Sequence, residues 1–240
     1  ITLQGVLFKK LPKADALYCH MNPEYTIASF PIAFITRTPI IHWYAHGAIT
    51  MRRKLVELFA KYIVTSSKKG FREPLFDKKV NVVGQGIDTN LFNYKPKQDV
   101  TEQRIVYVGR ISPVKDIESI LKALQILEEQ QIYFDIYGDP AMNEDAVYLK
   151  NLKMMTKALK LEDRVLFKGG VPYRKLPMIF QEADMLVNMS TTGSMDKTVL
   201  EAFATGCPVI TANDAYTDIL SKDAIVKHDD YKSLASKLDA

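Results

Sequence analysis

The sequence predicts an α/β fold with parallel sheets, because short apolar strands alternate with amphipathic helices along most of the chain. The clearest strand is "RIVYVG", which starts at Arg104 and is rich in β-branched and aromatic residues, as are strands buried on both faces. Apolar residues then recur at the spacing of a helix face, at Ile117, Ile120, Leu121, Leu124 and Leu127. Such alternation forms βαβ units, in which ligands lie beyond the carboxyl ends of the strands.

The rest of the C-terminal half continues the alternation. The strand "IYFDIYG" is followed by a helical stretch over roughly 146–160, and the strand "RVLFKG" by a helix from Leu176 to Ala183. The strand "DMLVNMS" precedes a small-residue loop, a helix and the strand "PVITA", and "AIVKH" and the helical "YKSLASKL" finish the chain. Gly206 fits the position just past a helix end, where a positive φ is needed.

The first ninety residues repeat the pattern in shorter form. "DALYCH" and "PIIHWYAHG" are predicted strands that end in His20 and in His46 and Gly47, "KLVELFAKY" is helical, and "IVTSS" and "VNVVGQGID" are further strands. The segment "DTNLFNYKPKQDVTEQ" is polar and aperiodic, as linkers between domains are. We therefore predict an N-terminal domain over 1–93, a linker over 94–103 and a C-terminal domain over 104–240.

Composition indicates a soluble globular protein. Of the 240 residues, 47% are apolar and 25% charged, and the net charge of +4 favours anionic partners such as phosphates or an acidic membrane surface. The chain lacks the dense Lys/Arg patterning and the motifs of nucleic-acid binders, so no nucleic-acid partner is predicted. Cys19 and Cys207 are predicted to be buried free thiols in a reducing compartment. No apolar run reaches the roughly 18 residues that span a bilayer, and we expect a cytoplasmic protein.

Two cations follow the first strand of the C-terminal half, in "VGRISPVKD". Arg110 comes directly after the strand, and Lys115 lies just before or within the first turn of the next helix. Cations oppose the helix macrodipole there, whereas anions are favoured by about 0.3–1 kcal/mol. The two cations therefore indicate an anion, such as a diphosphate, between them. The alternative is two solvated surface charges with Asp116 as a helix cap, and the spacing favours neither.

Glu201 lies inside the helix that follows the loop "GSMDK". A Gly-bearing loop that opens onto a helix N-terminus is how proteins hold phosphate-bearing ligands. A buried glutamate is costly unless it is paired or hydrogen-bonded, so we expect Glu201 to line a pocket and to accept hydrogen bonds from a polar ligand, such as ribose hydroxyls. The alternative is a partly exposed helix residue.

His46 is the candidate histidine, because it ends a predicted parallel strand and so lies at the ligand-binding edge. A structural role is the alternative for His46, and packing is the expected role of His42. No group of His, Cys, Asp and Glu has the spacing of metal ligands, and no metal site is predicted. Neither G-x-G-x-x-G nor a Walker loop occurs, which makes a dehydrogenase the least supported enzyme class.

Taken in order, several segments resemble the C-terminal half of the GT4-like retaining glycosyltransferases, which have the GT-B fold. They are "VVGQGIDTNLF", "VGRISPVKDIESILKAL", "FDIYGDP", "RVLFKGGVPYRKLPMIFQEADMLVNMS" and "VLEAFATGCPVI", while "DALYCH" and "PIIHWYAHG" look like later strands of the N-terminal domain. The resemblance covers nearly the whole chain. It implies a pair of Rossmann-like domains with parallel sheets, the acceptor-side domain over 1–93 being incomplete and the donor-binding domain lying over 104–240.

The resemblance also implies a reaction. A sugar passes from a UDP-, GDP- or ADP-sugar to a carbohydrate or lipid-linked acceptor in polysaccharide or glycolipid assembly, with retention of configuration and without a cofactor or metal. Arg110 and Lys115 would bind the diphosphate, and His46 would lie near the donor sugar; these three are the implied catalytic residues. The implied donor-binding residues are Gly109, Arg110, Lys115, Gly170, Val171, Gly193, Ser194, Asp196, Thr198 and Glu201.

The chain departs from the family pattern in two respects. The family carries two glutamates with seven residues between them, and the earlier position here is Gly193. Asp196 is a hypothetical substitute for a sugar-hydroxyl contact, with a loop aspartate near a helix cap as the alternative. The chain also starts at Ile1 without the family's first strand and glycine-rich loop, and it stops at Ala240 before the closing helices. We therefore expect a truncated chain that binds nucleotide and catalyses poorly or not at all.

Two other functions stay open, a sugar-nucleotide epimerase of the same fold and a non-catalytic nucleotide-binding remnant. Sugar transfer to an acceptor would exclude the epimerase, and binding without transfer would favour the remnant. The segment "MRRKLVELFAKY" joins basic residues to an apolar helical face, as interfacial helices do. An ordinary helix that covers the sheet is the favoured interpretation, and peripheral contact with the inner face of the cytoplasmic membrane is the alternative.

Overall fold

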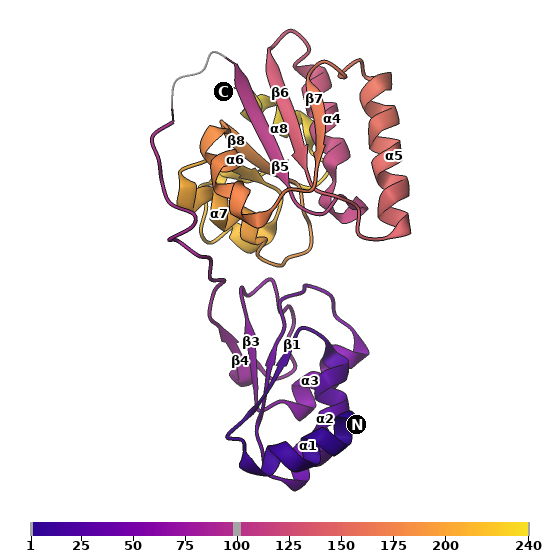
Figure 1. Cartoon of the computed structure of the whole chain (residues 1–240), viewed down its shortest axis with the longest axis vertical. Coiled ribbons are helices and arrows are strands. Elements are labelled where there is room, and N and C mark those ends of the chain that lie inside the picture. The colour runs from indigo at the N-terminus through magenta and orange to yellow at the C-terminus, as the bar shows by residue number, and fades with distance from the viewer. Residues whose placement is uncertain (1, 98–101, 240) are drawn as a thin grey trace. The chain divides into compact units, whose positions relative to one another are not determined.

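The computed structural model describes residues 2–97 and 102–239, so part of the predicted linker, 98–101, lies outside the described residues. The chain contacts divide it into two compact units, shown in Figure 1. The first comprises the residues up to Gln85 together with Thr192–Met195, and the second comprises Gly86–Thr191 with the residues from Asp196 onward. Each unit is described by itself below.

The first unit is built on a four-stranded parallel sheet in the order β1-β2-β3-β4. Helices α2 and α3 pack against each other, and α1 packs against α2 (Figure 1). Buried apolar residues such as Ile63 and Val56 form the core between the helices and the sheet. The elements are α1 (Leu3–Lys10), β1 (Leu17–His20), α2 (Pro23–Ile35), β2 (Ile40–Trp43), α3 (Met51–Phe59), β3 (Tyr62–Thr65) and β4 (Val80–Val82).

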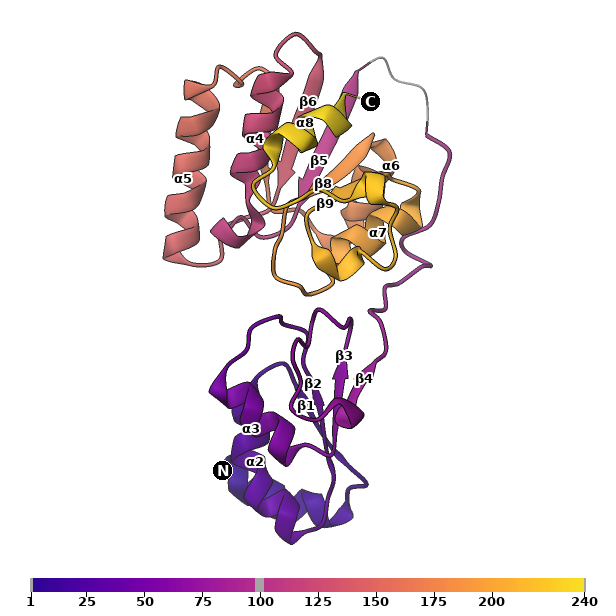
Figure 2. The ribbon, with the colours of Figure 1, turned by 180° about the vertical axis from the view of Figure 1, so that it is seen from behind.

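The second unit has a five-stranded parallel sheet in the order β7-β6-β5-β8-β9. Helix α4 packs against α5 and α8, and α6 packs against α7, so helices cover both faces of the sheet (Figure 2). The elements are β5 (Gln103–Val108), α4 (Ile117–Ile126), β6 (Ile132–Tyr137), α5 (Asn143–Ala158), β7 (Val165–Gly169), α6 (Leu176–Glu182), β8 (Met185–Asn188), α7 (Lys197–Thr205), β9 (Val209–Thr211) and α8 (Tyr231–Leu238). This architecture is the α/β fold with parallel sheets that the sequence predicts.

Two glycines show why the loops follow their observed paths. Gly206 directly follows α7 with a φ of 82°, as predicted for a residue that ends a helix in the left-handed region. Gly138, after β6, lies against the backbone of the neighbouring strand, and a Cβ there would lie 1.8 Å from the carbonyl oxygen of Gly109. The sheet therefore admits only glycine at this close approach.

The prediction that a strand runs to His46 is wrong. Strand β2 ends at Trp43, whose partner in the parallel register is Val64, one residue before β3 itself ends. The backbone N–H of His46 donates instead to the carbonyl of Gly70, in the loop after β3. His46 consequently lies on a loop, three residues past the strand. His42 lies within β2 and is fully buried, which confirms its predicted packing role.

Among the described residues, no helix is both long enough and apolar enough to cross a membrane. The most apolar candidate of the sequence forms helix α2, only 13 residues long and interrupted by Pro31. Cys19 and Cys207 are both free and buried, as predicted.

Candidate functional site

The strand order of the second unit places a candidate site beyond β5 and β8. Chain connections run from β5 outward to β7 on one side of the sheet and from β8 to β9 on the other. The order therefore reverses between β5 and β8, and ligands of open α/β sheets bind beyond the carboxyl ends of the strands at such a point. The loops that leave these two strands carry Arg110 and Lys115 on one side and Asp196 on the other.

Lys115 lies near the place between β5 and β8 where the strand order reverses, and two residues distant in sequence hold its side chain. It ends the 3₁₀ turn Pro113–Lys115 directly before α4, and its Nζ lies 2.8 Å from Asp196 Oδ1 and 3.2 Å from Ser190 Oγ. Its side chain is 14% exposed, so it is not the solvated surface charge of the alternative interpretation. The other part of that alternative is correct, because Asp116 caps α4 by accepting a hydrogen bond from the N–H of Ser119.

Arg110 is much less constrained. Its side chain is 46% exposed, and among the described residues its ionic partner is Asp145, with 3.8 Å between Arg110 Nε and Asp145 Oδ2. The backbone is better fixed, since the Arg110 carbonyl accepts a hydrogen bond of 2.8 Å from the hydroxyl of Tyr107. The loop therefore presents a fixed backbone with a guanidinium that can turn toward a ligand.

Asp196 occupies the N-cap position of α7, but its side chain does not cap the helix. Oδ1 faces Lys115, and Oδ2 accepts a hydrogen bond of 3.0 Å from Asn188 Nδ2. The hydroxyl of Tyr216 donates to the Asp196 carbonyl at 2.5 Å. Asp196 is thus near a helix terminus, as one interpretation held, while its carboxylate belongs to the polar network around Lys115.

Glu201 lies in the second turn of α7 and is only 1% exposed, so the alternative interpretation of a partly exposed helix residue is wrong. Its Oε1 accepts a hydrogen bond of 2.9 Å from the hydroxyl of Tyr173, in the loop between β7 and α6. Burial raises the pKa of Glu201, whereas the hydrogen bond from Tyr173 and the charge of Lys197 lower it. Burial and then the carboxylate raise the pKa of Tyr173 to about 12, so the phenol keeps its proton at neutral pH.

The remaining residues predicted to bind the donor lie on loops, apart from Thr198, which lies in α7. Gly109 follows β5, and Gly170 follows β7, where its N–H donates to Asp139 Oδ2 at 2.9 Å. Val171 is half-buried in the same loop, and Thr198 is half-buried in the first turn of α7. Gly193 and Ser194 lie in the loop between β8 and α7, within the stretch Thr192–Met195 that belongs to the first unit.

His46 belongs to the first unit. Its side chain is exposed, and its Nδ1 accepts a hydrogen bond of 3.2 Å from the N–H of Ala48. The hydrogen bond from Ala48 therefore orients the histidine ring through Nδ1. Nε2, the second ring nitrogen, takes no part in this contact.

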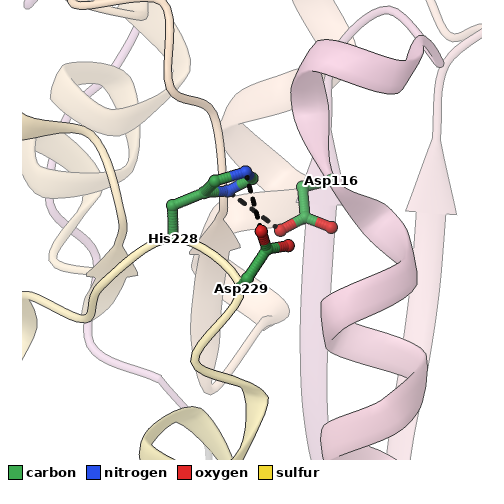
Figure 3. A group of neighbouring side chains, drawn as sticks. All are labelled: Asp116, His228 and Asp229. Atoms are coloured by element: carbon green, nitrogen blue, oxygen red, sulfur yellow. Dashed lines mark ion pairs between the residues drawn. The ribbon is translucent and has the colours of Figure 1, made fainter.

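A set of residues suited to metal binding lies outside this network. Asp116, His228 and Asp229 offer ligand atoms within 4.8 Å of one another, and Figure 3 shows both carboxylates beside the imidazole, each joined to it by an ion pair. Nδ1 of His228 is 3.3 Å from Asp116 Oδ2, and Nε2 is 3.4 Å from Asp229 Oδ2. Each ring nitrogen thus faces its own carboxylate, and Asp116 also accepts hydrogen bonds from Ser119. The contacts of the imidazole with the two carboxylates account for this geometry, although sequence spacing gave no sign of it.

Sequence reasoning missed Tyr173, Asn188 and Ser190. Asn188 and Ser190 end the predicted strand "DMLVNMS", so their place at the carboxyl edge was a usable signal. Tyr173 gave no such signal, because its contact with Glu201 joins a loop to a helix residue 28 positions later in the sequence.

Comparison with known proteins assigns the chain to a family. The family model described as "Glycosyl transferases group 1" matches residues 89–239. The chain belongs to this family. The match includes the whole of the network around Lys115 and the Tyr173–Glu201 contact.

Two curated relatives are similar to about half of this chain. A mannosylfructose-phosphate synthase of Agrobacterium fabrum is 28% identical over 55% of this chain, and an α-monoglucosyldiacylglycerol synthase of Streptococcus pneumoniae is 29% identical over 51%. The matched segments span only 32% and 27% of these relatives' own lengths.

Solved structures show the fold over nearly the whole chain. Anabaena HepE, crystallised with UDP and glucose, superposes with a TM-score of 0.84 at 19% identity, over 98% of this chain and 70% of HepE. A sucrose-phosphate synthase from Thermosynechococcus elongatus gives a TM-score of 0.77 at 18% identity, over 100% of this chain and 70% of the other. The group 1 chain thus has the predicted GT-B glycosyltransferase fold.

Proposed function

We propose that the chain is part of a retaining glycosyltransferase that moves a sugar from a nucleoside-diphosphate sugar to an acceptor hydroxyl. Residues 104–240 bind the donor, residues 1–93 serve the acceptor side, and 94–103 link them. The observation that carries the proposal is Lys115, a mostly buried cation held by Asp196 and Ser190 where the strand order reverses. Such a cation suits a diphosphate, the anion common to nucleotide sugars.

The chemistry follows from where charge develops. The bond from the sugar's anomeric carbon to the phosphate oxygen breaks, and its electron pair stays on the departing nucleoside diphosphate. Arg110 and Lys115 stabilise that charge more in the transition state than in the ground state. The acceptor oxygen attacks from the same face, which retains the configuration, and its proton passes to the departing phosphate. His46 contacts the donor sugar in this proposal.

The relatives support the donor class without fixing its identity. HepE was crystallised with UDP and with UDP-glucose, and the names of the curated relatives describe products that contain sugars. We propose a UDP-, GDP- or ADP-sugar as donor and a carbohydrate or lipid-linked acceptor in polysaccharide or glycolipid assembly.

The test is a calorimetric titration of the chain with UDP, GDP and ADP. We expect one nucleotide to bind and an Arg110→Ala, Lys115→Ala double variant to lose that binding. The matched control is Lys150→Ala, Lys157→Ala, which removes two exposed cations from α5. Absence of binding in a chain that unfolds cooperatively would overturn the diphosphate assignment.

Incubation with the sugar form of the bound nucleotide then separates the alternatives. Transfer to an acceptor supports the proposal, and inversion at a sugar carbon identifies the epimerase. Binding with neither reaction, also in a longer chain of the same protein, identifies a nucleotide-binding remnant. Loss of transfer in His46→Ala with unchanged nucleotide binding would support the role of His46.

We also propose that the first unit contacts the cytoplasmic face of a membrane. Residues 1–85 hold 13 Lys and Arg against 5 Asp and Glu, a formal charge of +8, whereas residues 86–240 hold 19 against 23. Large apolar side chains of the same unit are exposed, including Phe34 at 73%, Met51 at 73% and Leu58 at 53%. Basic surfaces with apolar side chains bind anionic bilayers.

The interpretation of "MRRKLVELFAKY" as an interfacial helix counts Arg53 among the basic residues that contact a membrane. In the structure Arg53, in α3, is fully buried and therefore unavailable to lipid. We expect the chain to sediment with vesicles that contain phosphatidylserine and not with vesicles of phosphatidylcholine alone. Met51→Ser, Leu58→Ser should weaken this binding, whereas Val147→Ser, Met154→Ser on the exposed surface of α5 should not. Sedimentation that does not depend on the anionic lipid content of the vesicles would contradict the proposal.

A further inference from the structure

Tyr173 is a half-exposed side chain fixed at both ends. It follows Pro172 in the 3₁₀ turn Tyr173–Lys175, and the residue is 49% exposed. Its ring meets the edge of Phe92 with 5.3 Å between ring centroids, and Phe92 is itself buried against Phe180. Its hydroxyl donates to Glu201 Oε1 at 2.9 Å. The ring is therefore positioned by packing, and the hydroxyl by one charge-assisted hydrogen bond.

The other oxygen of Glu201 is available to a ligand. None of the described residues donates a hydrogen bond to Oε2. Oε2 is not one of the described polar atoms that are both fully buried and without a partner. It therefore keeps contact with solvent, although Glu201 as a whole is only 1% exposed. A nearly buried carboxylate with one oxygen satisfied and one open suits a ligand that brings hydroxyl donors.

We propose that Tyr173 is a positioning residue of the nucleoside subsite, where it orients Glu201 so that the open oxygen receives the ribose hydroxyls of the donor. This inference rests on the proposed function, because it takes the ligand to be a nucleoside diphosphate. Tyr173 contacts the carboxylate at Oε1 and leaves Oε2 for the 2′- and 3′-hydroxyls. It thereby sets the preference of the site for ribose over sugars that lack these hydroxyls.

The phenol also affects the charge state on which this preference depends. Burial raises the pKa of Glu201, and the hydrogen bond from Tyr173 opposes that rise. Only the ionised carboxylate accepts hydrogen bonds through all its lone pairs. Without the phenol the pKa of Glu201 rises further, so the carboxylate becomes protonated at a higher pH than in the unaltered chain. As the solution is acidified, affinity for the ribonucleotide therefore begins to fall at that higher pH.

The experiment compares the nucleoside diphosphate that binds best among UDP, GDP and ADP with its 2′,3′-dideoxy analogue. Both are titrated into the unaltered chain, Tyr173→Phe, Glu201→Gln and Tyr25→Phe. The phenylalanine keeps the ring against Phe92. Tyr25 is the control, since it is 53% exposed and its side chain makes no hydrogen bond to a described residue.

We expect Tyr173→Phe to weaken ribonucleotide binding about tenfold, with little change for the dideoxy analogue, because the lost bond acts only through the ribose hydroxyls. Glu201→Gln should show the same selective loss, and Tyr25→Phe none. As the pH is lowered, the loss of ribonucleotide affinity should also begin at a higher pH in Tyr173→Phe than in the unaltered chain.

Three results would overturn the inference. Unchanged or tighter ribonucleotide binding by Tyr173→Phe would mean that the hydroxyl does not help or competes with the ligand. Equal losses for the ribonucleotide and the dideoxy analogue would assign Tyr173 to packing alone. If no nucleotide binds the unaltered chain, the proposed function fails first and the inference fails with it.

Discussion

Arg53 and Glu57 in the first unit and Lys115 and Asp196 in the second are both ion pairs, but they differ in exposure and in what surrounds them. The side chains of Arg53 and Glu57 are 0% exposed, with 3.2 Å between Arg53 Nη2 and Glu57 Oε1. Those of Lys115 and Asp196 are 14% and 19% exposed. The first pair is sealed from solvent, whereas the second lies at the sheet edge beyond which ligands of open α/β sheets bind.

The partners of the buried pair are backbone groups of a single loop. Arg53 donates to the carbonyls of Arg72 and Glu73, and its guanidinium lies 4.5 Å from the centre of the Phe71 ring. Glu57 Oε2 accepts a hydrogen bond from the N–H of Leu75. This pair therefore fixes the path of the loop after β3 and offers nothing to a ligand.

The partners of the half-open pair are other side chains. Lys115 also contacts Ser190, and Asp196 accepts from Asn188. A pair with solvent access can exchange one ionic partner for a bound anion at small desolvation cost. The comparison teaches that burial and partner type, more than charge, separate a structural ion pair from one available for binding.

The largest expected effect is on stability, at Arg53. Arg53→Met leaves Glu57 buried without its cation and should lower the free energy of unfolding of the first unit by about 3–5 kcal/mol. Urea unfolding measures this, with Arg52→Met as the control. Arg52 is 70% exposed and pairs with Glu24, so its loss should cost at most about 1 kcal/mol. Equal costs for the two variants would remove the distinction between the pairs.

Lys115 should show the opposite pattern, a large effect on binding with little on folding. Lys115→Met should weaken nucleoside diphosphate binding by about 1.5–3 kcal/mol, because a charge-assisted contact to the diphosphate is lost. Calorimetry measures the affinity, and urea unfolding checks that stability is nearly unchanged. If Lys115→Met destabilises the second unit as Arg53→Met does the first, the pair at Lys115 is structural too.

His42 extends the comparison to pH. It is fully buried, and the hydroxyl of Thr26 lies 2.7 Å from its Nδ1. Burial lowers the pKa of His42 to about 4 from an ordinary value of 6.5. At neutral pH the ring is uncharged in both states, but below pH 6.5 the unfolded chain takes up a proton that the folded chain refuses.

The stability of the first unit should therefore fall as the pH is lowered from 6.5 toward 4, by about 2 kcal/mol at pH 5, and this contribution should level off below pH 4. Urea unfolding across this range measures the slope. His42→Gln should remove that part of the slope, whereas His20→Gln, at an exposed position, should keep most of it, because the charge of His20 lowers the pKa of His42 less than burial does. The same slope in both variants would show that His42 is not the group responsible.

The smallest expected effect is at Asp196. Asp196→Asn keeps the shape of the side chain but removes a negative charge beside the diphosphate, so we expect nucleoside diphosphate affinity to rise about threefold. Turnover of the sugar nucleotide should fall, because Lys115 loses the group that positions it. Asp218→Asn, at an exposed position, is the control. Unchanged sugar preference in the Asp196 variant would exclude Asp196 from contact with the donor sugar.

Much of the fold could be predicted because its signals are local. The strand from Arg104, the helix from Ile117 and the glycine after α7 all follow from residue spacing and backbone conformation over a few positions. Strand ends were less accurate: the strand predicted to reach His46 stops at Trp43, because its length depends on where the neighbouring strand ends.

The amino-acid sequence by itself determined the alternation of strands and helices and the position of the cations that follow β5. Only the tertiary structure decided which groups these cations meet. Lys115 and Asp196 are 81 residues apart and become neighbours because β5 pairs with β8. Strand pairing of this kind depends on packing across the whole sheet, and local spacing does not encode it. The burial of Glu201 and its contact with Tyr173 arise in the same way, from the packing of segments that the sequence keeps apart.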